Sequence, residues 1–182
     1  MEPQAGVSEP AGHRRGAGRH CGNRRPRCPL QPPVTPLVGR AEAVDGDTLR
    51  PGDVRVRLTG LDAPEPDQTC IDAGGASWPC GRQARGFVAG LIEGQPVTCR
   101  PDGRDRYRSV LARCFVSGGD LGTSIVVAGW AVGDIDYALV EAGARTARRG
   151  IWAGAFMSPA DWRRNCGQEP SSVLEWIRAW FQ

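Results

Sequence analysis

Residues 44–65 constrain the fold of this chain more than any other stretch. They read VDGDTLRPGDVRVRLTGLDAPE, where short segments of alternating apolar and polar residues are separated by Asp-Gly and Pro-Gly pairs. Alternation with a period of two is typical of a β-strand with one buried face, and these pairs are typical of tight turns. The stretch therefore predicts short strands, the last of them at 54–60 with Val54, Val56 and Leu58 on its buried face.

Acidic and basic side chains are concentrated in the same stretch. Carboxylates stand at its turn-like ends and two arginines stand between them: Asp45, Asp47, Asp62 and Glu65, with Arg55 and Arg57. Carboxylates bind hard cations and guanidinium groups bind phosphate oxygens, so this pattern indicates a cation and a phosphate held side by side. The alternative interpretation is structural, with solvated Asp-Gly turns and arginines that pair with neighbouring acids.

The rest of the folded part alternates between strands and helices. The strands expected from apolar patterning and turn residues include 37–44, 48–50, 95–100, 109–116 and 130–132, with a loop at 66–79 and a turn at 101–103. The helices expected from a period of three to four residues cover 81–93, 121–128 and 138–149. This order predicts an α+β fold, a five-stranded OB-fold β-barrel with about three packed helices.

Three regions differ in composition. Residues 1–34 are rich in arginine, proline and glycine and have no apolar periodicity, so we expect a disordered tail. Residues 35–165 carry the patterned segments and are expected to form the domain. Residues 166–182 place apolar side chains on one side of a helical pattern, which predicts a C-terminal helical tail that docks on the domain. Docking on a partner or on a membrane surface is the alternative.

The distribution of charge excludes one class of function. All 23 basic residues are arginine, and the net charge is +3. The first forty residues carry +5 of it, so the remainder of the chain is negative, at −2. A nucleic-acid-binding module of the usual basic kind is therefore excluded. If the domain acts on a polyanion, it needs a local site with a metal ion.

The seven cysteines indicate disulfides more than metal binding. There is no CxxC pair, and both histidines lie in the N-terminal tail, so no zinc pattern is present. Pairing of Cys70 with Cys80 and of Cys99 with Cys114 is favoured over free buried thiols. Disulfides predict an oxidising compartment, periplasmic or secreted.

The N-terminal sequence favours a different location. It has no apolar segment of the signal-peptide kind, which leaves a cytoplasmic location as the alternative. No apolar run approaches the length of a membrane span, so we expect no transmembrane segment.

Five short motifs, in this order, resemble those of the staphylococcal (thermonuclease-like) nuclease family. They are DGDT at 45–48, RLTGLDAPE at 57–65, DRY at 105–107, DLG at 120–122 and GIWAG at 150–154. The resemblance covers about residues 37–163. It implies an OB-fold barrel and calcium-dependent cleavage of the phosphodiester bonds of DNA and RNA. Secreted bacterial members of the family often carry additional cysteines similar to these.

The resemblance also implies roles for individual residues. Asp47 and Asp62 match the calcium-binding carboxylates, and Ala63 stands where a backbone carbonyl also binds the metal. Glu65 matches the acid that positions or activates the attacking water, and Arg57 matches the first of two phosphate-binding arginines. These residue types suit those roles, because Ca²⁺ prefers oxygen ligands in irregular geometry and arginine offers a fork to two phosphate oxygens.

One departure from the family pattern concerns the second phosphate-binding arginine. The family usually reads DRYGR, whereas this chain reads DRYRS, so Ser109 stands in the arginine position and Arg108 precedes it. We expect Arg108 to act as a catalytic substitute, although a shift of one residue in a strand reverses the direction of a side chain.

Two functions follow from the sequence. The first is a calcium-dependent nuclease, impaired by Ser109, that acts as a monomer on single-stranded DNA or RNA. The second is a non-catalytic or retasked thermonuclease-like accessory protein, for example in exopolysaccharide biosynthesis of the succinoglycan type, a setting for which some relatives are named.

Overall fold

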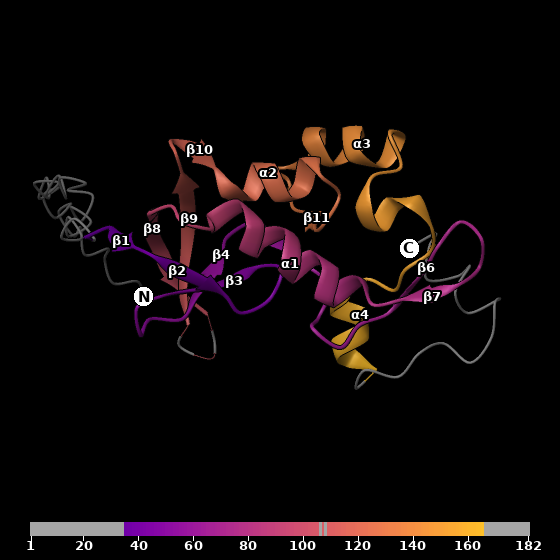
Figure 1. Ribbon diagram of the computed structural model, residues 1–182, viewed down its shortest axis with the longest axis horizontal. Helices are drawn as coiled ribbons and strands as arrows, with labels where there is room; N and C mark the ends of the chain where they lie inside the picture. Colours follow the sequence, from indigo (N-terminus) through magenta and orange to yellow (C-terminus); the bar gives the residue numbers. More distant parts are fainter. Residues whose placement is uncertain (1–34, 106, 108, 166–182) are drawn as a thin grey trace, which may run out of the picture. The chain divides into compact units, whose positions relative to one another are not determined.

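The computed structural model describes residues 35–105, 107 and 109–165 (Figure 1). These residues all lie within one compact unit of the chain. The tails expected at 1–34 and 166–182 are outside the described residues, so the domain limits remain predictions. Among the described residues, no helix combines the length and the apolar character that crossing a membrane requires.

The main sheet curls on itself. Its strand order is β1 (Leu37–Gly39), β8 (Val97–Arg104), β9 (Val110–Val116), β4 (Val56–Leu58), β3 (Thr48–Pro51) and β2 (Ala41–Ala43), and β10 (Gly119–Asp120) pairs with β9. Only Arg40 separates β1 from β2 in sequence, yet they lie at opposite ends of this order. The two edges must therefore meet. Counted as one strand bent at Arg40, β1 and β2 complete the five strands expected, and the α+β OB-type fold is confirmed.

The pairing of β4 brings the candidate site residues to the middle of the sheet. β4 pairs with β3 in antiparallel fashion and with β9 in parallel fashion. Val56 and Leu58 are buried, as predicted, but Val54 is exposed because β4 begins only at Val56. Arg57 therefore projects from the opposite face of a strand that has neighbours on both sides.

The prediction of a turn at 101–103 is wrong. β8 continues through these residues to Arg104, with a shift of register between Pro101 and Gly103. A proline cannot donate to the ladder, so it is tolerated at such a bulge. The turn lies further along, where the Asp105 backbone N–H donates to the Ser109 carbonyl over 3.0 Å.

Helices cover the apolar side of the sheet. α1 (Cys80–Ile92) packs against β2 and α2 (Leu121–Val127), and α2 packs against β9 and α3 (Ala138–Thr146) (Figure 1). The fully buried side chains between these elements include Leu49, Val56, Val88, Val97 and Ile125. Because the apolar residues of α1 and α2 recur at helical spacing, the sequence predicted this core.

A second, smaller core holds the loop that was expected at 66–79. The loop contains a hairpin of β6 (Cys70–Ile71) and β7 (Ser77–Trp78), which packs near the 3₁₀ helix η1 (Gly150–Ala153). The Cys70–Cys80 disulfide joins this hairpin to the start of α1, with an S–S distance of 1.99 Å. The Cys99–Cys114 disulfide links β8 to β9 over 2.02 Å. Both expected pairings are confirmed.

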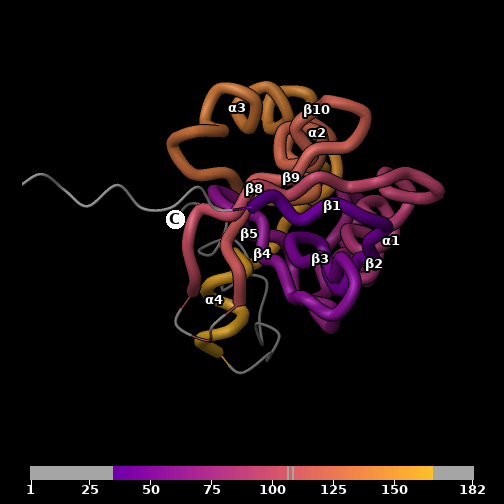
Figure 2. Tube along the Cα trace, turned by 90° about the vertical axis from the view of Figure 1, so that its left-hand side faces the viewer, coloured from indigo at the N-terminus to yellow at the C-terminus, as the bar shows by residue number. Residues whose placement is uncertain are grey.

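Several elements differ from expectation. β5 (Leu61–Asp62) pairs with β11 (Val132–Gly133), and a fourth helix among the described residues, α4 (Pro159–Arg164), was not predicted. The helix expected to reach residue 149 ends at Thr146. Figures 1 and 2 both show α4 on the side opposite α2 and α3.

Candidate active site

The turn between β2 and β3 brings Asp47 to the loop that follows β5. The Asp47 backbone N–H donates to Asp45 Oδ1 over 2.9 Å, which closes the Asp-Gly-Asp turn. A Cβ atom at Gly46 would lie 2.6 Å from the Ala63 Cβ, so a larger residue there would separate the turn from the loop. Glycine at this position therefore permits the close approach of the two acidic segments.

Arg57 links the two carboxylates that the sequence assigns to a metal. Its Nη2 lies 2.6 Å from Asp62 Oδ1 and 3.2 Å from Asp47 Oδ2. Asp47 also accepts hydrogen bonds from Thr48 Oγ1 over 2.8 Å and from the Ala63 backbone N–H over 3.3 Å. The structure thus gathers Asp47, Arg57, Asp62 and Ala63 around one point.

The buried position of Asp47 makes its negative charge costly. Burial, followed by the nearby Asp45 carboxylate, raises the pKa of Asp47 from 3.8 to about 7, against a lowering by Arg57. One arginine therefore does not fully compensate the charge, and a cation at this carboxylate would be favourable. The donor set of two carboxylates and a backbone carbonyl also has the chemistry that Ca²⁺ prefers.

Arginine nitrogens lie between these carboxylates. Among the described residues, no group of three or more acidic, histidine or cysteine side chains is arranged to hold a metal ion. Asp47 and Asp62 are instead bridged by Arg57. A metal ion would therefore have to be accompanied by a rearrangement of the arginine contacts.

Arg163 is a site residue that the sequence analysis missed. Its Nη1 lies 2.7 Å from Glu65 Oε1 and 2.9 Å from Asp62 Oδ1, and its Nη2 lies 2.9 Å from Asp62 Oδ2. The hydrogen bonds with Asp62, and less strongly those with Glu65, raise the pKa of Arg163. The available signal was the Ser-Pro start of a helix at 158–159, which favours a short helix carrying Arg163.

A cleft beside Arg57 has room for part of a nucleotide. Its volume is about 380 Å³, and its lining includes Arg55, Arg57, Tyr107 and Ser109. Arg55 and Arg57 reach the same cleft because alternate residues of a strand share a face. Arg55 Nη2 lies 3.6 Å from Asp45 Oδ2, so the two side chains form an ion pair.

Asp105, Tyr107 and Ser109 also line this cleft. Asp105 Oδ1 accepts hydrogen bonds from the backbone N–H groups of Tyr107 and Ser109, each over 2.8 Å. Asp105 therefore both stabilises the turn and lines the cleft. Ser109 lies where the family pattern calls for an arginine. Arg108 and Arg106 are outside the described residues, so the catalytic role expected for Arg108 remains a prediction.

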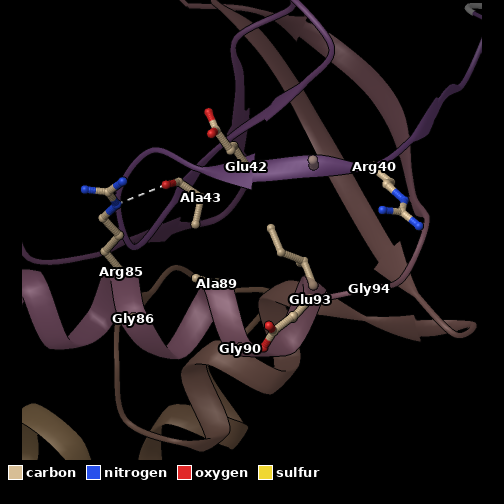
Figure 3. A pocket seen from close by; sticks show the side chains of 11 residues that line it. Arg40, Glu42, Ala43, Arg85, Gly86, Ala89, Gly90, Glu93 and Gly94 are labelled. Carbon is tan, nitrogen blue, oxygen red and sulfur yellow. Dashed lines mark hydrogen bonds between the residues drawn. The ribbon is translucent and has the colours of Figure 1, made fainter.

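A larger cavity lies away from these residues. It occupies about 510 Å³ between β2 and α1, where the small residues Gly86, Ala89 and Gly90 leave space (Figure 3). The figure shows Arg85 reaching from α1 to the Ala43 carbonyl, a contact of 3.0 Å. None of the predicted site residues lines this cavity.

Comparisons with known proteins show the family of this chain. The sequence model described as Staphylococcal nuclease homologue matches residues 55–154. The succinoglycan biosynthesis protein ExoI of Rhizobium meliloti (strain 1021) is 37% identical over 124 residues, which cover 64% of this chain and 65% of that protein. An uncharacterized endonuclease of Escherichia coli is 31% identical over 140 residues, which cover 70% of this chain and 85% of that protein.

A more distant relative comes from a fungus. The probable endonuclease LCL3 of Schizophyllum commune (strain H4-8 / FGSC 9210) is 27% identical over 167 residues, which cover 74% of this chain and 56% of that protein. The chain thus spans less than two thirds of the length of ExoI and of this LCL3 protein.

The curled sheet, the acid–arginine cluster and the adjoining cleft define a nuclease-like OB-fold domain. The chain belongs to the staphylococcal nuclease homologue family, and several of its relatives are named endonucleases. The predicted family resemblance is confirmed, and the matched residues 55–154 contain four of the five motifs, all but DGDT at 45–48. The residue roles that it implied are not tested by these comparisons.

Proposed function

We propose that this protein is a calcium-dependent nuclease that hydrolyses phosphodiester bonds of single-stranded DNA or RNA. The observation that carries the proposal is the contact of Arg57 Nη2 with both Asp47 and Asp62 at the edge of a 380 Å³ cleft. A phosphate-binding group and two candidate metal ligands are thereby within one hydrogen bond of each other.

In this proposal Asp47, Asp62 and the Ala63 carbonyl would hold the calcium ion. When bound, calcium supplies Lewis-acid polarisation of a phosphate oxygen and lowers the pKa of a coordinated water. Arg57 turns from the carboxylates to the phosphate, where its charge opposes the negative charge that develops in the transition state. Glu65 orients the attacking water or accepts its proton, since it lies on the same loop as Asp62 and Ala63.

Ser109 limits the rate that this site is expected to reach. A serine hydroxyl in the wall of the cleft offers one neutral donor, whereas an arginine offers a charged fork. Loss of one charged donor to a transition state costs about 3 kcal/mol, or roughly two powers of ten in rate. The proposed enzyme is therefore a slow nuclease unless Arg108 takes the role.

The second candidate function is a retasked accessory protein in exopolysaccharide biosynthesis. Two observations favour it: the serine at position 109 and the 37% identity to a protein named for succinoglycan biosynthesis. In that case the cleft would bind a phosphate-containing ligand without cleaving it.

The compartment and assembly form part of the same proposal. The two disulfides support an oxidising compartment, periplasmic or extracellular, because thiols stay reduced in most cytosols. We propose that the protein acts as a monomer, since one chain carries all the candidate site residues.

Cleavage of labelled single-stranded DNA and RNA, with calcium and with chelator, tests the proposal. We expect calcium-dependent cleavage by the wild type and at least a hundredfold loss in Asp47→Ala. Equal rates in these two proteins, or no cleavage in calcium, would favour the accessory function instead. Asp53→Ala, in an exposed turn of the same acidic stretch, is the matched control.

A further inference from the structure

We propose that Arg163 is a positioning residue of the candidate active site. It holds the side chains of Asp62 and Glu65 at a fixed spacing and supplies positive charge between them. The inference rests on the proposed function, because the value of this spacing lies in the metal and the water that the two acids would handle.

The Arg163 guanidinium binds both oxygens of one carboxylate and one oxygen of a second. Nη1 and Nη2 of Arg163 bind the two Asp62 oxygens, each over 2.9 Å, and Nη1 also binds Glu65 over 2.7 Å. A bidentate guanidinium fixes the plane of a carboxylate, which a single point charge does not. Asp62 and Glu65 therefore have their orientations set by the same group.

The helix that carries Arg163 is capped at its N-terminus and is attached to the domain through Trp162. Ser158 Oγ accepts a hydrogen bond from the Asp161 backbone N–H over 3.1 Å and caps the first turn. Trp162 is buried, and its indole N–H donates to Asp67 over 3.3 Å. Asp67 belongs to the loop that also carries Glu65, so this hydrogen bond joins α4 to the loop of an acid that Arg163 contacts.

A buried glutamine makes a second connection. Gln68 is fully buried, accepts from the Glu65 backbone N–H over 3.2 Å, and donates to the Met157 carbonyl over 2.7 Å. The residues just before α4 and the backbone of Glu65 are thus joined through one side chain. Arg163 approaches the acids from an element whose position is already fixed, as a positioning role requires.

The next residue, Arg164, forms an ordinary surface ion pair and can be compared with Arg163. Arg164 is 70% exposed and pairs within its own helix with Asp161. Such pairs contribute little, because both charges remain solvated. Arg163 is 37% exposed and contacts two acids 98 and 101 positions away. Arg164 is therefore a control with the same chemistry on the same helix.

Replacing Arg163 with glutamine is expected to raise the affinity for calcium and to lower kcat. Calcium binding should tighten about tenfold in Arg163→Gln, because a positive charge beside the Asp62 carboxylate opposes a cation. The kcat for oligonucleotide cleavage should fall about ten- to a hundredfold, with KM changed less than threefold, since Glu65 and Asp62 lose their orientation. A merely structural residue would weaken both together.

The experiment measures the calcium Kd by titration calorimetry, and kcat and KM on a single-stranded oligonucleotide, for the wild type, Arg163→Gln, Arg163→Lys and Arg164→Gln. Thermal unfolding shows that each variant is folded. Arg163→Lys should return the calcium Kd to within about threefold of wild type but leave kcat low, because lysine keeps the charge without the fork. Arg164→Gln should match the wild type throughout.

The outcomes separate this inference from the proposed function. If the wild type binds calcium and cleaves, but Arg163→Gln matches it in Kd and kcat, the inference alone is overturned. A parallel loss of calcium affinity, kcat and thermal stability in Arg163→Gln would also overturn it. A wild-type protein that neither binds calcium nor cleaves removes both proposals.

Discussion

Among the described residues, Asp47 is a carboxylate whose negative charge is poorly compensated. Its pKa is raised from 3.8 to about 7, chiefly by burial. At a pH between 3.8 and about 7, the Asp47 carboxyl has lost its proton in the unfolded chain but keeps it in the native protein. The contribution of Asp47 to stability therefore falls as the pH rises through this window, and its full penalty, about 4 kcal/mol, is present above pH 7.

The substitution Asp47→Asn should remove this pH dependence. In chelator, we expect the variant to lose less stability than the wild type between pH 4 and pH 7, because asparagine does not ionise. Urea unfolding at several pH values measures the difference. Asp53→Asn, at an exposed turn, should keep the wild-type slope. An unchanged slope in Asp47→Asn would show that the carboxylate is not buried as the structure has it.

Ser109 is the residue that most limits the expected chemistry. It lies in the wall of the cleft that Arg57 also lines. We expect Ser109→Arg to raise kcat about ten- to a hundredfold at saturating calcium, because a charged donor returns to the developing charge. Ser109→Ala should have nearly the wild-type rate. Equal kcat in Ser109→Arg and the wild type would mean that another group, such as Arg108, already does this work.

At the scale of elements, the Cys70–Cys80 disulfide ties the hairpin β6–β7 to the start of α1. Cys80 lies directly after this hairpin, and its Sγ and the Gly81 backbone N–H both contact the Gln68 carbonyl. The cross-link therefore also fixes the loop that presents Glu65. The sequence separation of ten residues makes the closed loop short.

Replacing both cysteines of this pair by alanine should cost about 3 kcal/mol in the free energy of unfolding, the loop-closure value for such a length. Urea unfolding under oxidising conditions measures the loss. Amide exchange should accelerate first at β6, β7 and the loop around Gln68. If exchange accelerated equally across β8 and β9, which the Cys99–Cys114 disulfide joins, the local role assigned to this cross-link would be wrong.

The elements show why some of the fold could be predicted and some could not. The strands around Arg57 and the helix α1 carry strong periodic patterns, so sequence reasoning located them. The segment Pro101–Asp102–Gly103 has the composition of a turn, but sheet pairing of β8 with β9 overrides this local preference. The helix α4 has six residues, too few for a periodic pattern to be recognised.

At the scale of the whole molecule, the candidate site is assembled from three distant parts of the chain. Residues 45–65 supply the acids and Arg57. Asp105, Tyr107 and Ser109 line the adjoining cleft, and α4 supplies Arg163. The first two parts carry motifs that the sequence analysis linked through the family resemblance. Arg163 has no such motif in that analysis, and the contacts of Trp162 with Asp67 and of Gln68 with Met157 bring its helix to the loop of Glu65.

The chain belongs to the staphylococcal nuclease homologue family, and the nuclease reaction proposed for this assembly agrees with that membership. Ser109 is expected to limit the rate of the proposed reaction. The central claim is that the acids bridged by arginine form a metal-dependent phosphodiesterase site. Asp62 is the most direct probe of it, because both Arg57 and Arg163 contact its carboxylate.

The measurement is the single-turnover rate of oligonucleotide cleavage across a calcium titration, for the wild type, Asp62→Asn and Asp67→Asn. We predict a wild-type rate that rises to saturation with calcium and vanishes in chelator. Asp62→Asn should cleave at least a hundredfold more slowly, whereas Asp67→Asn, which keeps an oxygen acceptor for the Trp162 indole N–H, should match the wild type. Cleavage that is independent of calcium, or equal in all three proteins, would contradict the claim.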